Sequence, residues 1–128
     1  RYMVAADVGN PVNPRLIEGQ LGGGAAQGIG GALSEEFLFS ATGEPLSANL
    51  TDYVLPTADR IPDIEFLITD DAPSPLTPLG IKGAGELGTN GAGAAIAAAI
   101  DHAIGIPGAV TRLPVTPSRL RAILRGIG

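Results

Sequence analysis

A helical pattern crowded with glycine is the feature that most constrains how this chain can fold. Asn13 and Pro14 are typical of a helix N-cap and a first helical position, and apolar residues spaced four apart follow them, as on one helix face. We expect this helix to end near residues 35–37, with Glu35 and Glu36 in solvent. The apolar face consists of Ile17, Leu21, Ala25, Ile29 and Leu33.

Seven glycines fall within the same predicted helix, from Gly19 to Gly31. Each is expected to destabilise a helix interior by about 0.5–1 kcal/mol relative to alanine. The sequence therefore predicts one of two arrangements. Either the helix breaks near residues 22–24, or another backbone or a ligand approaches it very closely. Tight packing between this helix and a sheet explains the glycines as well as a ligand does.

Composition narrows the classes of function. The 128 residues are 45% hydrophobic but only 4% aromatic, which predicts one core of alanine, isoleucine, leucine and valine. A net charge of −5 without a basic stripe argues against a nucleic-acid partner. No stretch approaches the roughly 20 apolar residues of a membrane span. We expect a cytoplasmic protein.

The cysteine and histidine counts restrict metal chemistry. The chain has no cysteine, which excludes disulfides and iron–sulfur ligation by this chain, and its single histidine disfavours a metal site built from side chains alone. A redox metal must therefore arrive within a cofactor. The first residues read as a strand already under way, and we interpret residues 1–128 as a single fragment of something longer.

Strand and helix patterns alternate in no simple repeat, which favours an α+β fold with a mixed sheet and helices around one core. Apolar, β-branched stretches predict strands at residues 2–8 and 64–69. A hairpin is expected within residues 37–55, and a short extended segment at residues 52–56.

Two further helices have clear boundaries. An alanine-rich helix is predicted over residues 92–104, with Gly105 as its stop, and a last helix from Thr116 and Pro117 to Gly126. In the last helix, the expected buried stripe is Leu120, Ile123 and Leu124, and the expected solvated residues are Arg119, Arg121 and Arg125.

A second glycine-rich segment, residues 80–91, precedes the alanine-rich helix. Residues 83–88 match the G-x-G-x-x-G pattern of dinucleotide-binding folds, but prolines stand where that fold needs a strand, so we disfavour this interpretation. The loop does offer unencumbered N–H groups ahead of a helix, which suit a phosphate or pyrophosphate. Glu86, a lone carboxylate within the loop, is either a solvated surface charge or a functional residue.

Three stretches in order resemble the large subunit of the molybdenum hydroxylases, the family of aldehyde oxidases, xanthine dehydrogenases and carbon-monoxide-dehydrogenase-like proteins. The first runs from Asp-Val-Gly-Asn-Pro at residue 7 through the Gly19-Gln20 pair to Gln-Gly-Ile-Gly at residues 27–30. The second lies within residues 52–62, and the third starts with Lys-Gly-Ala-Gly-Glu at residue 82. A single motif of this kind is weak, but three in register are specific.

The resemblance implies the C-terminal part of a molybdopterin-binding domain, with molybdenum on a pyranopterin, usually as the cytosine dinucleotide in bacterial members. It also implies partners: the remainder of the large subunit, an iron–sulfur subunit or domain and, in some members, a flavoprotein subunit with FAD. The implied reaction hydroxylates an aldehyde or an N-heterocyclic carbon of a small-molecule substrate, with water as the oxygen source.

Residue roles follow from the same resemblance. The family's Gly-x-Gly-Glu glutamate maps onto Glu86, as a general base toward Mo–OH. The glutamine that binds the pterin maps onto Gln20, whose amide both donates and accepts hydrogen bonds, although a helix-surface glutamine is the plain alternative. Gly22 departs from the pattern, because many relatives have histidine there. The expected cofactor-binding residues are Gln20, Lys82, Gly83, Ala84 and Gly85, and none is expected to ligate the metal directly.

An alternative interpretation remains open: a non-catalytic structural or interaction module that completes a partner subunit's fold. Under either interpretation we expect the chain alone to be inactive, because the family's other cofactor-binding and substrate-pocket segments are absent from it.

Overall fold

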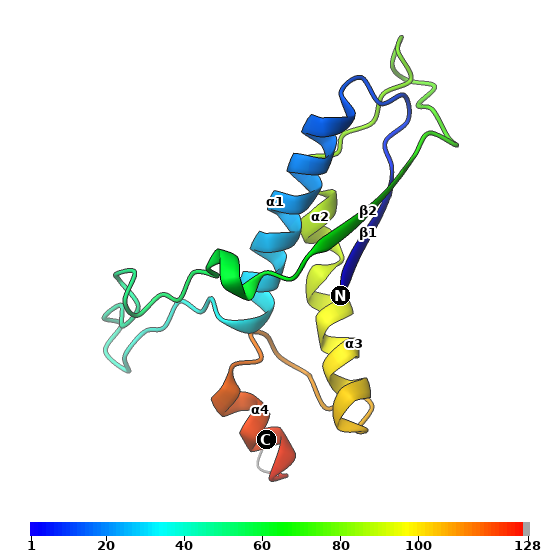
Figure 1. Cartoon of the computed structure of the whole chain (residues 1–128). Coiled ribbons are helices and arrows are strands. Elements are labelled where there is room, and N and C mark those ends of the chain that lie inside the picture. The colour runs from blue at the N-terminus through cyan, green and yellow to red at the C-terminus, as the bar shows by residue number, and fades with distance from the viewer. Residues whose placement is uncertain (127–128) are drawn as a thin grey trace.

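The computed structural model describes residues 1–126, and one long helix organises them. A two-stranded sheet and two consecutive helices pack against this helix α1, while a fourth α-helix lies near its C-terminal end (Figure 1). None of the helices in this part of the chain is both long and apolar enough to cross a membrane. In chain order the elements are β1 (Tyr2–Asp7), α1 (Pro14–Leu33), the 3-10 helix η1 (Ala58–Arg60), β2 (Ile64–Thr69), α2 (Leu87–Asn90), α3 (Ala92–Ile104) and α4 (Pro117–Leu124).

The sheet pairs the two strands that the sequence predicts. β1 and β2 run parallel, with Tyr2 opposite Ile64 and Asp7 opposite Thr69. Beyond β1 the pairing becomes antiparallel at an isolated bridge between Gly9 and Ile81. One face of the sheet packs on α1, and the small core lies there. This mixture of helices and strands confirms the predicted fold class. The core cluster contains Val4, Leu21 and Ala25, with Tyr2, Ala6, Ile17, Ile64, Phe66 and Ile68 packed against it.

Helix α1 starts where the sequence predicts and runs unbroken through its glycines. The Asn13 side chain accepts a hydrogen bond from the Leu16 N–H at 3.2 Å, which satisfies one of the free donors of the first turn. The helix ends at Leu33, slightly earlier than predicted. The N–H groups of Ser34 and Glu35 both donate to the Gly30 carbonyl at 2.9 Å, which closes the last turn.

Glycines bring the backbones of α1 and α2 into direct contact. A Cβ added at Gly24 would lie 3.2 Å from the Gly88 Cα, and one added at Gly88 would meet the Leu21 carbonyl oxygen and lie 2.7 Å from the Ala25 nitrogen. Thr89 stabilises this contact, because its hydroxyl donates a hydrogen bond to the Gly24 carbonyl at 2.9 Å. Of the two predicted arrangements, the close approach of another backbone is therefore confirmed.

The two later helices begin and end close to their predicted positions. Helix α3 has the predicted bounds, and Gly105 ends it in the left-handed conformation with a φ of 72°. The Thr116 hydroxyl caps α4 by accepting from the Arg119 N–H. The predicted apolar stripe of α4 is only partly covered, because Leu124 is 58% exposed.

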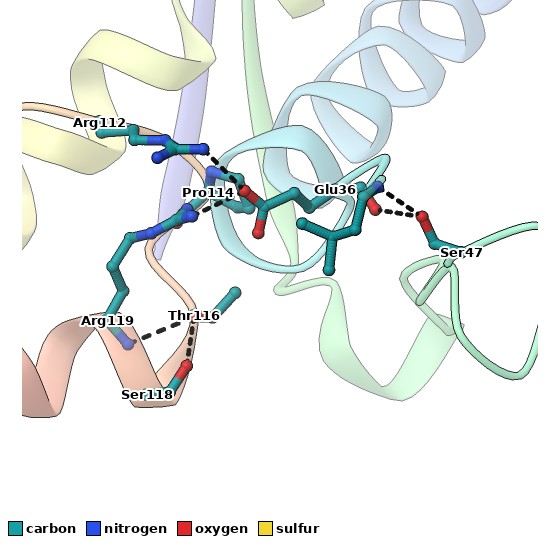
Figure 2. A network of polar contacts seen from close by, with 8 residues as sticks. Glu36, Ser47, Arg112, Pro114, Thr116, Ser118 and Arg119 are labelled. Carbon is teal, nitrogen blue, oxygen red and sulfur yellow. Dashed lines mark hydrogen bonds and ion pairs between the residues drawn. The ribbon is translucent and has the colours of Figure 1, made fainter. Parts of the chain in front are cut away.

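The region after α1 is less regular than predicted. The hairpin is a single antiparallel bridge between Phe39 and Pro45, and residues 54–57 form no strand. The two arms of the hairpin are joined by a hydrogen bond from the Leu46 N–H to the Leu38 carbonyl at 2.7 Å. The Ser47 hydroxyl is buried and fastens the hairpin to the chain after α1, donating to the Glu36 carbonyl at 3.0 Å (Figure 2).

The expectation that Glu35, Glu36 and Arg119 are simply solvated is wrong. Arg119 donates to the Glu36 carboxylate at 2.7 Å and to the Pro114 carbonyl at 2.6 Å, and Arg112 lies 3.3 Å from the same carboxylate (Figure 2). Glu35 accepts a hydrogen bond from the Tyr53 hydroxyl at 2.8 Å. The end of α1 is therefore a polar junction that holds α4 and the segment around Tyr53.

Candidate cofactor site

The glycine-rich loop begins as a short extension of the sheet. The Lys82 N–H donates to the Val8 carbonyl at 2.9 Å, and the Asn10 N–H donates to the Gly80 carbonyl at 3.3 Å. Gly9, with a φ of 61°, makes this approach possible, since any Cβ there would overlap the Gly80 carbonyl. The end of β1 and the start of the loop are thus held together by backbone hydrogen bonds.

One carboxylate reinforces this junction. Asp7 Oδ1 accepts from the Gly9 N–H at 2.9 Å and lies 3.2 Å from Lys82 Nζ, while Oδ2 accepts from the Ala72 N–H at 2.9 Å. The hydrogen bond from Gly9 and the neighbouring Lys82 ammonium hold the pKa of the Asp7 carboxyl below its usual value, against the opposing effect of partial burial. Asp7 therefore stays ionised and joins three segments of the chain.

The other end of the loop is fixed by packing. Gly88 is buried against the backbone of α1, and the Thr89 hydroxyl donates to the Gly24 carbonyl. Because backbone atoms meet backbone atoms there, the start of α2 has little freedom to slide along α1. Residues 83–87 span the distance between this packed end and the junction at Lys82.

A pocket of about 410 Å³ lies between the loop and the first turns of α1. Four of the five predicted cofactor-binding residues line it, and the structure brings the first and third sequence motifs together there: a Cβ added at Gly85 would lie 3.8 Å from the Gln20 side-chain oxygen. Gly83 is not part of the lining. The four predicted residues are Gln20, Lys82, Ala84 and Gly85, and the remaining lining includes Asn10, Asn13, Val12 and Leu16.

The loop also presents free donors. Within residues 1–126, the N–H groups of residues 83–86 have no hydrogen-bond acceptor, and Gln20 is exposed at the pocket. Four consecutive N–H groups beside an amide that donates and accepts suit an anionic heterocyclic group. The residues present therefore fit a pterin cofactor with phosphates, although Lys82 already has a partner in Asp7.

Glu86 lies next to this pocket at the N-cap of α2. Its carbonyl accepts from the N–H groups of Thr89 and Asn90 at 3.1 and 3.2 Å, which orients the backbone. The side chain is exposed, and no hydrogen bond or ion pair holds its carboxylate within the part of the chain that the structure describes. It directly follows Gly85, which lines the pocket beside Gln20, but Glu86 itself is not part of the lining.

The geometry does not suit a dinucleotide-binding fold. β2 ends at Thr69, well before the glycine pattern at residues 83–88, and the intervening residues form turns. That fold requires a strand that leads directly through the glycines into a long helix, whereas here the four-residue α2 comes first.

Sequence reasoning missed the part that Asp7 plays. Asp7 lies within the first of the three stretches that resemble the molybdenum hydroxylases, but its partners Ala72 and Lys82 are 65 and 75 residues away along the chain. The local signal was an acidic residue at a strand end, two residues before a glycine, which is typical of a side chain that accepts from a turn N–H.

Comparisons with known proteins agree with this geometry. Residues 1–62 match a family model described as the molybdopterin cofactor-binding domain. The gamma subunit of the 6-hydroxypseudooxynicotine dehydrogenase complex of Paenarthrobacter nicotinovorans is 45% identical over 127 residues, which are 99% of this chain and 16% of that subunit. The chain thus spans about a sixth of this relative's length.

Solved structures show the same likeness. Quinoline 2-oxidoreductase from Pseudomonas putida 86 matches 96% of this chain and 16% of its own, with a TM-score of 0.89 and 36% identity. CO dehydrogenase from Oligotropha carboxidovorans matches 98% of this chain and 16% of its own, with a TM-score of 0.90 and 31% identity.

Fold, loop and comparisons together define a segment of the molybdopterin-binding part of a molybdenum-dependent oxidoreductase. More particularly, the chain belongs to the molybdenum hydroxylase family and corresponds to a segment of its large subunit.

Proposed function

We propose that this chain supplies part of the active site of an enzyme that hydroxylates an aldehyde or an N-heterocyclic carbon with water as the oxygen source, and that Glu86 is its general base. The observation that carries the proposal is the meeting of Gln20 with Gly85, the residue directly before Glu86, at one pocket. Family membership favours this function over a purely structural module.

The residues at the pocket have distinct parts in the proposal. Gln20 and the N–H groups of residues 83–85 would hold the molybdenum–pterin cofactor, which supplies two-electron redox chemistry when bound. We infer the cytosine dinucleotide form. Glu86 accepts a proton at a carboxylate oxygen as the nucleophile attacks the substrate carbon. The flanking backbone, held by hydrogen bonds to the Glu86 carbonyl, fixes the point from which that side chain leaves the loop.

Substrate and partners are part of the same proposal. Quinoline is an N-heterocycle, and the name of that relative, at 36% identity against 31% for CO dehydrogenase, supports the N-heterocyclic substrate class. The gamma subunit named above belongs to a complex, which supports further subunits here as well. We propose that the rest of the large subunit, an iron–sulfur subunit or domain and, where present, a flavoprotein subunit with FAD complete the enzyme and carry electrons away.

The test is Glu86→Gln in the full-length large subunit, assembled with its partners and loaded with cofactor. We expect kcat to fall by at least about 10²-fold, as for loss of a general base, with the molybdenum content unchanged. Glu44→Gln, which changes an exposed carboxylate in the hairpin, is the matched control and should leave kcat unchanged. Wild-type turnover by Glu86→Gln at full molybdenum content would contradict the catalytic assignment and favour the structural module.

A further inference from the structure

The loop that presents Glu86 is held at its two ends by different means. At one end, two residues after the glutamate, Gly88 and Thr89 pack on α1. At the other end, four residues before the glutamate, Lys82 is held by one backbone hydrogen bond to Val8 and by the carboxylate of Asp7. Between them, the N–H groups of residues 83–86 have no acceptor among the described residues, and a single long hydrogen bond from the Leu87 N–H to the Ala84 carbonyl, at 3.4 Å, lies within the loop. The path of the loop therefore depends mainly on its two ends.

Asp7 is suited to hold the first end because each of its oxygens has a partner on a different segment. Oδ1 accepts a hydrogen bond from the Gly9 N–H and pairs with the Lys82 ammonium, and Oδ2 accepts from the Ala72 N–H. The Asp7 side chain is 27% exposed and that of Lys82 35%, so solvent screens the pair only in part. An amide in place of the carboxylate would lose the charge and one of the two acceptor atoms.

We propose that Asp7 is a positioning residue for the reaction proposed above, and that it acts by holding Lys82 and thereby the path of residues 83–86. The inference rests on Glu86 being the base. The inference also changes the role of Lys82: its ammonium is paired with Asp7, so its main contribution is to place the loop, of which Ala84 and Gly85 line the pocket.

The experiment compares Asp7→Asn with Asp71→Asn in the assembled, cofactor-loaded enzyme. Asp71 is an exposed carboxylate beside the same turn, so its variant changes the net charge equally and serves as the matched control. We expect Asp7→Asn to lower kcat by about 10–100-fold, as for a reacting group displaced by about 1 Å, with KM and molybdenum content near wild type. Amide hydrogen exchange over residues 80–86 should accelerate in Asp7→Asn and stay unchanged in Asp71→Asn.

Lys82 variants test the same pair from the other side. Lys82→Gln should accelerate exchange over the same residues and lower kcat as Asp7→Asn does. Lys82→Arg retains a cation for the carboxylate and should recover most of that activity. If Asp7→Asn does not fold, Lys82→Gln carries the test alone. Loss of molybdenum in Lys82→Gln without faster exchange would mean that the ammonium binds the cofactor directly, and would overturn the inference.

Glu86→Gln measured in parallel separates this inference from the function on which it rests. An inactive Glu86→Gln together with unchanged exchange and kcat in Asp7→Asn overturns the positioning role alone. A fully active Glu86→Gln overturns the proposed base, and with it the catalytic meaning of Asp7, whatever the exchange data show.

Discussion

Two of the contacts that helix α1 makes with the rest of the chain are built by opposite means. In its middle, Gly24 and Gly88 let the backbones of α1 and α2 touch, with no side chain between them. At its C-terminal end, α4 is held through the ion pair of Arg119 with Glu36 and the hydrogen bond from the Val115 N–H to the Ala32 carbonyl at 2.7 Å (Figures 1 and 2). The first contact accepts no added atom, whereas the second depends on charges that water and salt weaken.

The candidate site is built on the first contact. Gln20 directly precedes Leu21, whose carbonyl meets Gly88, and Glu86 lies two residues before that glycine. One backbone contact therefore lies close in sequence to both Gln20 on α1 and Glu86 at the start of α2. The difference teaches that the α2 end of the loop is placed by a contact without side-chain freedom, whereas the polar junction depends on side chains that can move.

The largest expected effect breaks the backbone contact. Gly88→Ala places a methyl group against the Leu21 carbonyl and the Ala25 nitrogen, neither of which can rotate away, so we expect the free energy of unfolding to fall by about 3 kcal/mol. Gly31→Ala is the matched control, because nothing lies within 4 Å of the added methyl. There the higher helix propensity of alanine should raise the free energy of unfolding by up to about 1 kcal/mol. Denaturant unfolding measures both, and a loss of equal size in the two variants would refute the contrast.

An intermediate effect is expected at the polar junction. Arg119→Ala removes donors to the Glu36 carboxylate and the Pro114 carbonyl, and we expect a loss of about 1–2 kcal/mol after allowance for partial exposure. Arg121→Ala, an exposed arginine of the same helix, should have little effect. Molar salt should shrink the difference between the two variants, and an unchanged difference would argue that packing, not charge, holds α4.

The smallest effect concerns Tyr53. Its hydrogen bond to Glu35, together with the charge of that carboxylate, raises the pKa of the Tyr53 phenol above 10.0. The bond therefore stabilises the fold fully below about pH 10, and this contribution is lost as the pH rises through the raised pKa. Glu35→Gln should return the Tyr53 pKa toward 10.0.

Absorbance titration can follow this shift cleanly, because the chain has two tyrosines and no tryptophan. Tyr2, whose pKa burial raises, should titrate as before in Glu35→Gln and serves as the internal control. Identical titrations of the wild type and the variant would show that the Tyr53–Glu35 hydrogen bond is not part of the polar junction.

Local signals predicted most of the fold. The Asn13 cap, the Gly105 stop and the Thr116 cap each act within one helical turn, so the sequence placed these helix ends correctly. The partners of Glu36 were not predictable in this way, since Arg119 lies 83 residues further on. A glutamate just after a helix looks solvated unless the distant partner is known.

The candidate site likewise contains residues that the sequence could predict and one whose role depends on distant partners. The resemblance to known motifs brought Gln20 and the loop at residues 82–86 together, and the pocket lined by four predicted residues agrees with it. Asp7 escaped notice because its contacts with Ala72 and Lys82 arise only when β1 and β2 are already paired. The role of Glu86 itself remains a prediction.

The register of the sheet has a consequence for how the chain folds. Every residue of β1 pairs with one 62 positions later, as Tyr2 does with Ile64. The helix between them carries seven glycines and has little tendency to form before its partners arrive. Neither element can nucleate alone, so closure of a long loop must come early, and we expect slow, highly cooperative folding of the kind seen at high contact order.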